Sequence, residues 1–144
     1  MSLVSHWSLG LSSAIELGQA AVRKAAERQI SGFVAVYDRE GVPLYCQSVG
    51  LHYTAEDVSI AQAKIRTVII NQRSTSRLRR DIEAYKSSRE DYAGVVETLF
   101  SGGIALFHER KFIGAIAFSG ATQEGDEDIC LTAAREVGVQ TDIS

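Results

Sequence analysis

The chain has 144 residues, of which 45% are hydrophobic and 23% are charged, and its formal net charge is −3. These values are typical of one globular domain that buries roughly two thirds of its unfolded surface, and they exclude a disordered chain. The acidic balance argues against nucleic acid as a partner, and no apolar run reaches the ~18 residues that would span a membrane.

Cysteine usage and the N-terminus indicate the compartment. Cys46 and Cys130 are the only cysteines, and neither belongs to a CxxC motif or a Cys/His cluster. Both lie among apolar residues, which predicts buried, reduced thiols. Residues 1–10 contain neither the basic run nor the apolar core of a signal peptide. We therefore expect a cytoplasmic protein.

The first third of the chain predicts a helix followed by a hairpin. Ser13 and Glu16 have the spacing of a capping box, and alanines and aliphatic residues recur at helical spacing over residues 13–28. Residues 33–48 form two extended runs around the turn at 38–41, which ends in glycine. Branched and aromatic side chains in these runs favour strands, so we expect a β-hairpin here.

The middle of the chain predicts helices. Thr54 and Asp57 again have capping-box spacing, and they precede an amphipathic helix that ends near Gln72. Residues 74–88 predict a more polar helix, and residues 89–100 a short one.

The last third predicts a second hairpin and a final helix. Residues 104–120 carry apolar residues on both sides of a turn at 109–110. Thr122 is placed to cap a helix whose first turn is acidic, and Gly138 is placed to end it.

This order of elements predicts the fold class. Hairpins separated by helices favour an antiparallel sheet flanked by helices, so we expect an α+β fold in a single domain, residues 1–144. Because the strands are few, an edge or a face of the sheet needs a partner, which predicts a homo-oligomer.

Four segments resemble a known family. They are VAVYDREG (34–41), SIAQAKIRT (59–67), SGGI (101–104) and FIGAIAFSGATQEGDEDI (112–129). In this order they resemble the GlcG/HbpS-like haem-binding family, which includes the C-terminal domain of the PduO corrinoid enzymes. The resemblance covers about residues 10–138. It implies a profilin-like α/β sandwich, homo-oligomeric assembly, frequent encoding in catabolic operons and a small-molecule ligand, with haem or another tetrapyrrole as the best-known class.

Three loops depart from the family pattern. Residues 53–57 read YTAED where the family commonly has a segment like Arg-Met-Asp-Gly-Ala. Ser74 and Ala105 stand where the family commonly has prolines. The resemblance implies that these loops line the ligand cavity, so the ligand of this chain can differ from that of its relatives.

Lys64 is the first candidate site residue. At 100° per residue it lies beside the apolar face of its helix, in line with Thr67. One interpretation is a side chain that snorkels along the core edge with its ammonium in water. The other is a side chain that enters a cavity under the sheet and pairs with a carboxylate or a haem propionate. Because Lys64 matches a recurrent family position, we favour the second, in which Lys64→Ala loses anion affinity with little loss of stability.

Ser101, Gly102 and Gly103 are the second candidate. Two adjacent glycines allow the chain to reverse, which is the simpler interpretation. They also expose backbone amides that can hold a carboxylate or an oxyanion, and the resemblance places this loop at the mouth of the pocket.

The histidines are candidate axial ligands for haem, because haem iron needs an axial donor. His52 precedes the lysine helix near the expected cavity, and His6 of a neighbouring subunit is the other option. His108 is expected at a solvated strand end. No two histidines have metal-ligand spacing, so no metal site is predicted. The basic residues of 73–89 are interpreted as a solvated helix or a subunit contact that pairs with the acids of 124–128, rather than a phosphate-binding patch.

Two functions remain open, and a third option is an oligomeric accessory protein without a ligand. The first is a small-molecule binding protein, with Lys64, Thr67, His52 and the 101–103 loop around the ligand. The second is a small enzyme that acts on an organic acid or an aromatic metabolite, with Lys64 and the 101–103 loop in its site. The sequence contains no nucleophile elbow and no phosphate-binding loop, so catalytic residues are not identified.

Overall fold

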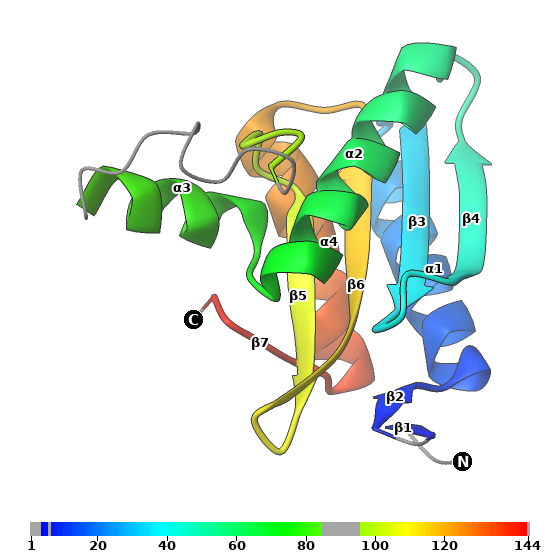
Figure 1. The fold of residues 1–144 in the computed structure, drawn as a ribbon. Coiled ribbons are helices and arrows are strands. Elements are labelled where there is room, and N and C mark those ends of the chain that lie inside the picture. Colours follow the sequence, from blue (N-terminus) through cyan, green and yellow to red (C-terminus); the bar gives the residue numbers. More distant parts are fainter. Residues whose placement is uncertain (1–3, 6, 85–95, 144) are drawn as a thin grey trace.

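An antiparallel sheet of five strands organises the chain, in the order β4-β3-β6-β5-β7 (Figure 1). This computed structural model describes residues 4, 5, 7–84 and 96–143. The α+β class predicted from the sequence is confirmed. The strands are β1 (Val4–Ser5), β2 (Ser8–Leu9), β3 (Gly32–Asp38), β4 (Pro43–Val49), β5 (Gly103–His108), β6 (Lys111–Ser119) and β7 (Gln140–Thr141). The helices are α1 (Leu11–Glu27), α2 (Ala55–Asn71), α3 (Thr75–Ala84) and α4 (Gln123–Val137).

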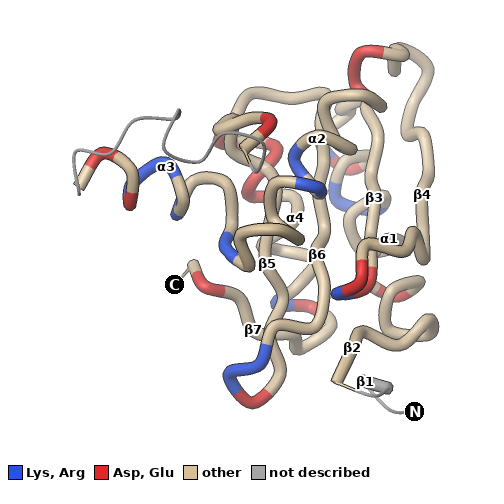
Figure 2. The backbone as a smooth tube through the Cα atoms, viewed as in Figure 1, with Lys and Arg blue, Asp and Glu red and all other residues tan. Residues whose placement is uncertain are grey.

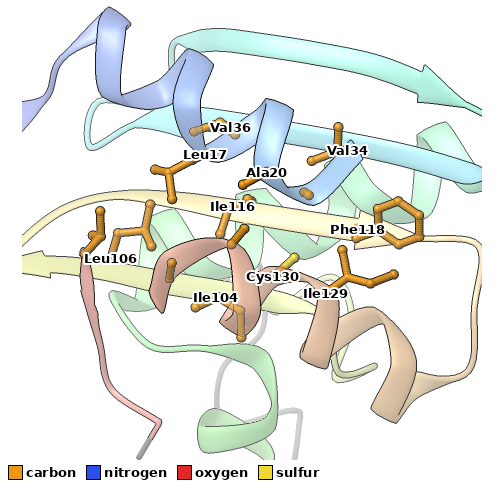
Figure 3. Close-up of a cluster of buried hydrophobic side chains, with 14 of the residues drawn as sticks. Leu17, Ala20, Val34, Val36, Ile104, Leu106, Ile116, Phe118, Ile129 and Cys130 are labelled. Atoms are coloured by element: carbon orange, nitrogen blue, oxygen red, sulfur yellow. The ribbon is translucent and has the colours of Figure 1, made fainter. Parts of the chain in front are cut away.

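Helices cover both faces of the sheet. α1 and α4 pack together on one face, and α2 crosses the other (Figure 1). Figure 3 shows the larger core, in which Leu17 and Ala20 of α1 and Ile129 of α4 meet side chains of the sheet. Because alternate residues of a strand point to opposite faces, Val34 joins this core while Ala35 faces α2.

The two hairpins and most helix ends agree with the sequence predictions. Thr54 accepts a hydrogen bond from the Asp57 amide, and the Asp57 carboxylate accepts one from the Thr54 amide, so the predicted capping box is confirmed. Thr122 caps α4, as predicted. Gly138 ends that helix with a φ of 85°, in the left-handed region that glycine adopts without strain.

Other predictions need correction. Ser13 is not a cap, because α1 begins two residues earlier and Gly10 occupies the N-cap position without a side-chain hydrogen bond. β1, β2 and β7 were not predicted, since two-residue strands leave no periodic pattern. α3 covers 75–84 of the helix predicted over 74–88, and residues 85–88 lie outside the described residues. Of the helix predicted over 89–100, residues 89–95 lie outside the described residues, and residues 96–100 are not helical, so the prediction is wrong there.

Two basic residues of this region form ion pairs with an acid of α3, whereas Arg79 donates to Ser101 and Gln123 outside the helix. Arg73 and Arg77 both contact the Asp81 carboxylate, at 3.1 and 3.6 Å. Within one chain, no ion pair joins the described residues of α3 to the acids of 124–128, although the Ser76 hydroxyl donates to Glu127. Figure 2 shows that Lys, Arg, Asp and Glu lie mostly in the helices and turns rather than in the strands of the sheet. No helix within the described ranges is long and apolar enough to cross a membrane.

The turn between β5 and β6 is built from non-glycine residues in the left-handed region. Glu109 has a φ of 49° and Arg110 a φ of 68°. For residues with a Cβ this region costs about 1–2 kcal/mol each, and asparagine tolerates it best. Both central positions of this turn are therefore strained.

We expect Glu109→Asn to raise the free energy of unfolding by about 0.5–1 kcal/mol, because asparagine suits the first position of such a turn. Urea denaturation followed by circular dichroism measures the change. Glu40→Asn is the matched control, since it removes an exposed glutamate from the other hairpin turn, where no positive φ is found at this residue. A gain no larger than that of the control would contradict the explanation by strain.

Candidate functional site

Lys64 is almost completely buried, with a side chain only 1% exposed. Its ammonium donates to Asp126 Oδ2 at 2.9 Å and to the Phe118 carbonyl at 2.9 Å. The interpretation with the ammonium in water is therefore wrong. The side chain does point under the sheet toward a carboxylate, and that carboxylate belongs to the same chain.

Asp126 lies in the first turn of α4, where the sequence pattern indicates only an acid near the helix dipole. Its Oδ1 accepts a hydrogen bond from the Ala121 amide at 2.8 Å. Burial raises the pKa of this carboxyl, while the neighbouring Lys64 ammonium partly opposes that rise. The 62 positions between Lys64 and Asp126 leave no spacing signal, so only the fold reveals the pair.

A pocket of about 310 Å³ opens above this pair. Lys64 and Asp126 line it together with Asp57, the loop 119–121, Gln123 and two apolar residues, Ile60 and Phe100. Phe100 is 54% exposed, which is unusual for a phenylalanine. We call this cavity the Lys64 pocket.

The 101–103 loop lies against the pair, and its amides have partners within the chain. The Ser101 amide donates to Gln123 Oε1 and the Gly103 amide to the Thr75 hydroxyl. Gly102 has a φ of 120°, and a Cβ built there would lie 2.7 Å from the Lys64 ammonium nitrogen. The loop is therefore shaped to admit the lysine, and two of its three amides are already engaged.

Thr67 and His52 do not join the Lys64 pocket. The Thr67 hydroxyl donates to the Ala63 carbonyl and accepts from the Glu97 amide, so it ties α2 to the segment before β5. His52 is exposed in the loop before α2, and its backbone amide donates to the Ser31 hydroxyl. Of the predicted site residues, the structure thus brings together Lys64 and the 101–103 loop only.

The cysteines differ from each other. Cys130 is buried, as predicted, and burial strongly raises the pKa of its thiol. Cys46 is exposed on the edge strand β4, so the prediction of a buried thiol is wrong there. Within the part of the chain that the structure describes, no cluster of His, Cys, Asp or Glu side chains could hold a metal ion.

A second and larger cavity, of about 550 Å³, lies between α4, β5 and β7. Its apolar wall consists of Phe107, Leu131, Ala134, Val139 and Ile143. Arg110 and Arg135 also line it, and neither forms an ion pair with any described residue. Asp142 is the acid of the lining, and its carboxylate accepts from the amide and the hydroxyl of Ser74. We call this cavity the α4 groove; nothing in the sequence pattern predicted it.

Comparisons with known proteins agree with this architecture. Residues 9–135 match the model of the family described as haem degrading protein HbpS-like. The chain is 28% identical over 139 residues to the corrinoid adenosyltransferase PduO of Citrobacter freundii, a match that covers 93% of this chain. It spans only 40% of that relative's length.

Solved structures share the fold. The crystal structure of a PduOC:heme complex superposes with a TM-score of 0.80 at 25% identity, over 93% of this chain and 98% of that one. The crystal structure of HbpS superposes with a TM-score of 0.78 at 21% identity, over 94% of this chain and 93% of that one.

Proposed function

Because this chain belongs to the HbpS-like family of haem degrading proteins, we propose that it binds haem or a closely related tetrapyrrole. The PduOC:heme complex supports this ligand class, since it shares the fold over nearly the whole chain. Which of the two cavities receives the ligand is decided by size, polarity and charge.

The α4 groove fits a tetrapyrrole better than the Lys64 pocket does. It is the larger of the two, about 550 against 310 Å³, and both volumes lie in the range of small-molecule sites. Its aliphatic and aromatic wall suits the porphyrin ring. In the Lys64 pocket the single cation already pairs with Asp126, whereas the α4 groove has two arginines without an ion pair to any described residue.

The two arginines of the α4 groove are the observation that carries the proposal. Haem has two propionate groups at one edge of the ring, and guanidinium groups bind carboxylates in paired hydrogen bonds. Arg110 is kept in a strained left-handed conformation, and such strain is found most often where a side chain has a function. We infer that Arg110 and Arg135 hold the propionates at the mouth of the groove.

We propose that the axial donor comes from a second copy of the chain. None of the residues that line the α4 groove is one of the usual haem ligands, histidine, cysteine, methionine or tyrosine. The loop that carries His52 follows β4 at the end of the sheet opposite to β7 (Figure 1). His52 of the partner subunit or the partner's His6 would complete the site. The complete site would then need two subunits, which fits the predicted homo-oligomer.

A haemin titration followed by absorbance tests haem binding. We expect a saturable Soret band for the wild-type protein. The double variant Arg110→Gln/Arg135→Gln should weaken binding about tenfold or more, because two charge-assisted contacts are lost. Arg39→Gln is the matched control, since Arg39 is an exposed arginine in the other hairpin turn and does not line the groove.

Three outcomes count against parts of the proposal. Without a saturable band, the protein is not a haem binder. Equal affinities of the double variant and the wild type would remove the ligand from the α4 groove. A Soret maximum that stays unchanged in both His52→Ala and His6→Ala would refute the proposed axial donors.

A small enzyme that acts on an organic acid or an aromatic metabolite is the second candidate. It is supported by the Lys64 pocket, in which a buried ion pair lies below the exposed ring of Phe100. Turnover of such a metabolite by the purified protein, and its loss in Asp126→Asn with the fold intact, would support this candidate. Equal turnover in that variant would contradict it.

A further inference from the structure

The charges around the Lys64 pocket do not favour a simple anion site. Its lining carries one cation, Lys64, and two carboxylates, Asp57 and Asp126. The lysine charge is already matched by Asp126 at 2.9 Å. A ligand carboxylate that entered alone would therefore meet an excess of negative charge at close range, where a low dielectric makes repulsion strong.

The geometry nevertheless leaves room for one more acceptor at the lysine. An ammonium has three N–H donors. Among the described residues the Lys64 ammonium has two acceptors, Asp126 Oδ2 and the Phe118 carbonyl, and the side chain lines the pocket. Above it, Ile60 and the exposed Phe100 form an apolar rim. The pocket thus offers a donor at its floor and an apolar surface at its mouth, which suits a small carboxylate with an aromatic or aliphatic body.

We propose that the Lys64 pocket binds such a carboxylate together with one proton, which is taken up from solvent by Asp126. The ligand carboxylate accepts a hydrogen bond from the Lys64 ammonium, and Asp126 becomes a neutral carboxyl group. No covalent bond forms or breaks, and the net charge of the pocket is the same before and after binding. The proposal is independent of haem binding, and it names the ligand class on which the second candidate function depends.

Asp126 is the group that can accept this proton. Its burial already raises its pKa, and Asp57 adds to the rise, whereas Lys64 and the Ala121 amide oppose it. Sharing the lysine with a ligand weakens the largest opposing effect. The other titratable neighbours are Glu127 and Cys130 on α4, and Gln123 is neutral.

Benzoate and benzamide make a matched pair of probes, since they differ in charge and hardly in shape. Between about pH 5.5 and 8 benzoate stays ionised, so a pH dependence of its affinity reports protein groups. If one proton accompanies each ligand, the association constant of benzoate should fall by up to about tenfold per pH unit, while that of benzamide stays level. Isothermal titration calorimetry in two buffers of different ionisation enthalpy counts the protons directly.

Asp126→Asn tests the role of the carboxyl group. Asparagine has the shape of a protonated aspartic acid but cannot take up a proton, so this variant should bind benzoate at least as tightly as the wild type and with no pH dependence. Asp128→Asn is the matched control, because it removes an exposed acid from the same helix. Its association constant for benzoate should change with pH as that of the wild type does. Circular dichroism confirms that both variants are folded.

The proposal is overturned if benzoate shows no saturable binding at the acid end of this range, or if its affinity for the wild type does not change with pH. It is also overturned if the affinity of Asp126→Asn for benzoate changes with pH as that of the wild type does. The double variant Arg110→Gln/Arg135→Gln separates the two proposals: it should bind benzoate normally, whether or not it has lost haem.

Discussion

Replacing Lys64 with alanine is expected to lower the free energy of unfolding by about 3–5 kcal/mol, because it leaves a buried carboxylate without its partner. Asp126 has a side chain only 5% exposed, so its carboxylate is poorly solvated without the ammonium. The sequence analysis expected little loss of stability, since it placed the ammonium toward a ligand. Urea denaturation followed by circular dichroism measures the effect.

Two further variants separate the charge effect from lost packing. In Lys64→Met/Asp126→Leu both charges are replaced by apolar groups, and stability should return to near the wild-type value. Arg28→Ala breaks an ion pair with Asp128 at the surface and should cost less than about 1 kcal/mol. A loss of under about 1 kcal/mol in Lys64→Ala itself would show that Asp126 is not held as a buried carboxylate.

Gly102→Ala is expected to cost about 3–5 kcal/mol for two separate reasons. A φ of 120° lies in a region that residues with a Cβ rarely adopt. The added methyl group would also lie 2.7 Å from both the Lys64 ammonium nitrogen and the Asp126 Cβ, so the buried pair would have to move apart. Thermal and urea unfolding measure the loss.

Gly138→Ala provides the matched control for this substitution. Gly138 also has a positive φ, of 85°, but a Cβ built there meets nothing within 4 Å. Gly138→Ala should lower the free energy of unfolding by only about 1–2 kcal/mol, the cost of placing a residue with a Cβ in the left-handed region. Equal losses in the two variants would mean that the collision with Lys64 and Asp126 contributes nothing.

Local signals in the sequence predicted most of the elements. The capping pattern of Thr54 and Asp57 and the placement of Gly138 are short-range features, and the structure confirms both. The resemblance to the HbpS-like family is confirmed as well. Ser13 was misread because Gly10 can end the preceding extended segment without any side-chain cap.

The candidate site depended on contacts that no local pattern records. The helical position of Lys64 beside an apolar face indicated a side chain directed under the sheet. It did not indicate that Asp126 is the partner of Lys64 there. Asp126 looked like one of several acids in a helical first turn. His52 was placed near the cavity from its position in sequence alone, and the turn of the chain after β4 leaves it exposed instead.

The α4 groove was missed for a related reason. Arg110 belongs to a hairpin turn and Arg135 to the last turn of α4, so each has an ordinary local explanation. They line one cavity only because β7 returns along β5. A strand of two residues is below what periodicity can detect, and the cavity that it borders could not be foreseen.

The strand order has a consequence for how the chain acquires its structure. β3 (32–38) pairs with β6 (111–119), so the centre of the sheet joins two segments that are separated in the chain by β4, α2, α3 and β5. During synthesis the hairpin of β3 and β4 exists long before its central neighbour has been made. Pairing between segments so far apart in the chain slows folding. The apolar faces of the β3–β4 hairpin and of α1 stay uncovered until the C-terminal half has been synthesised. Folding of this chain is therefore expected to be completed late, after β6 has entered between β3 and β5 and α4 has packed against α1.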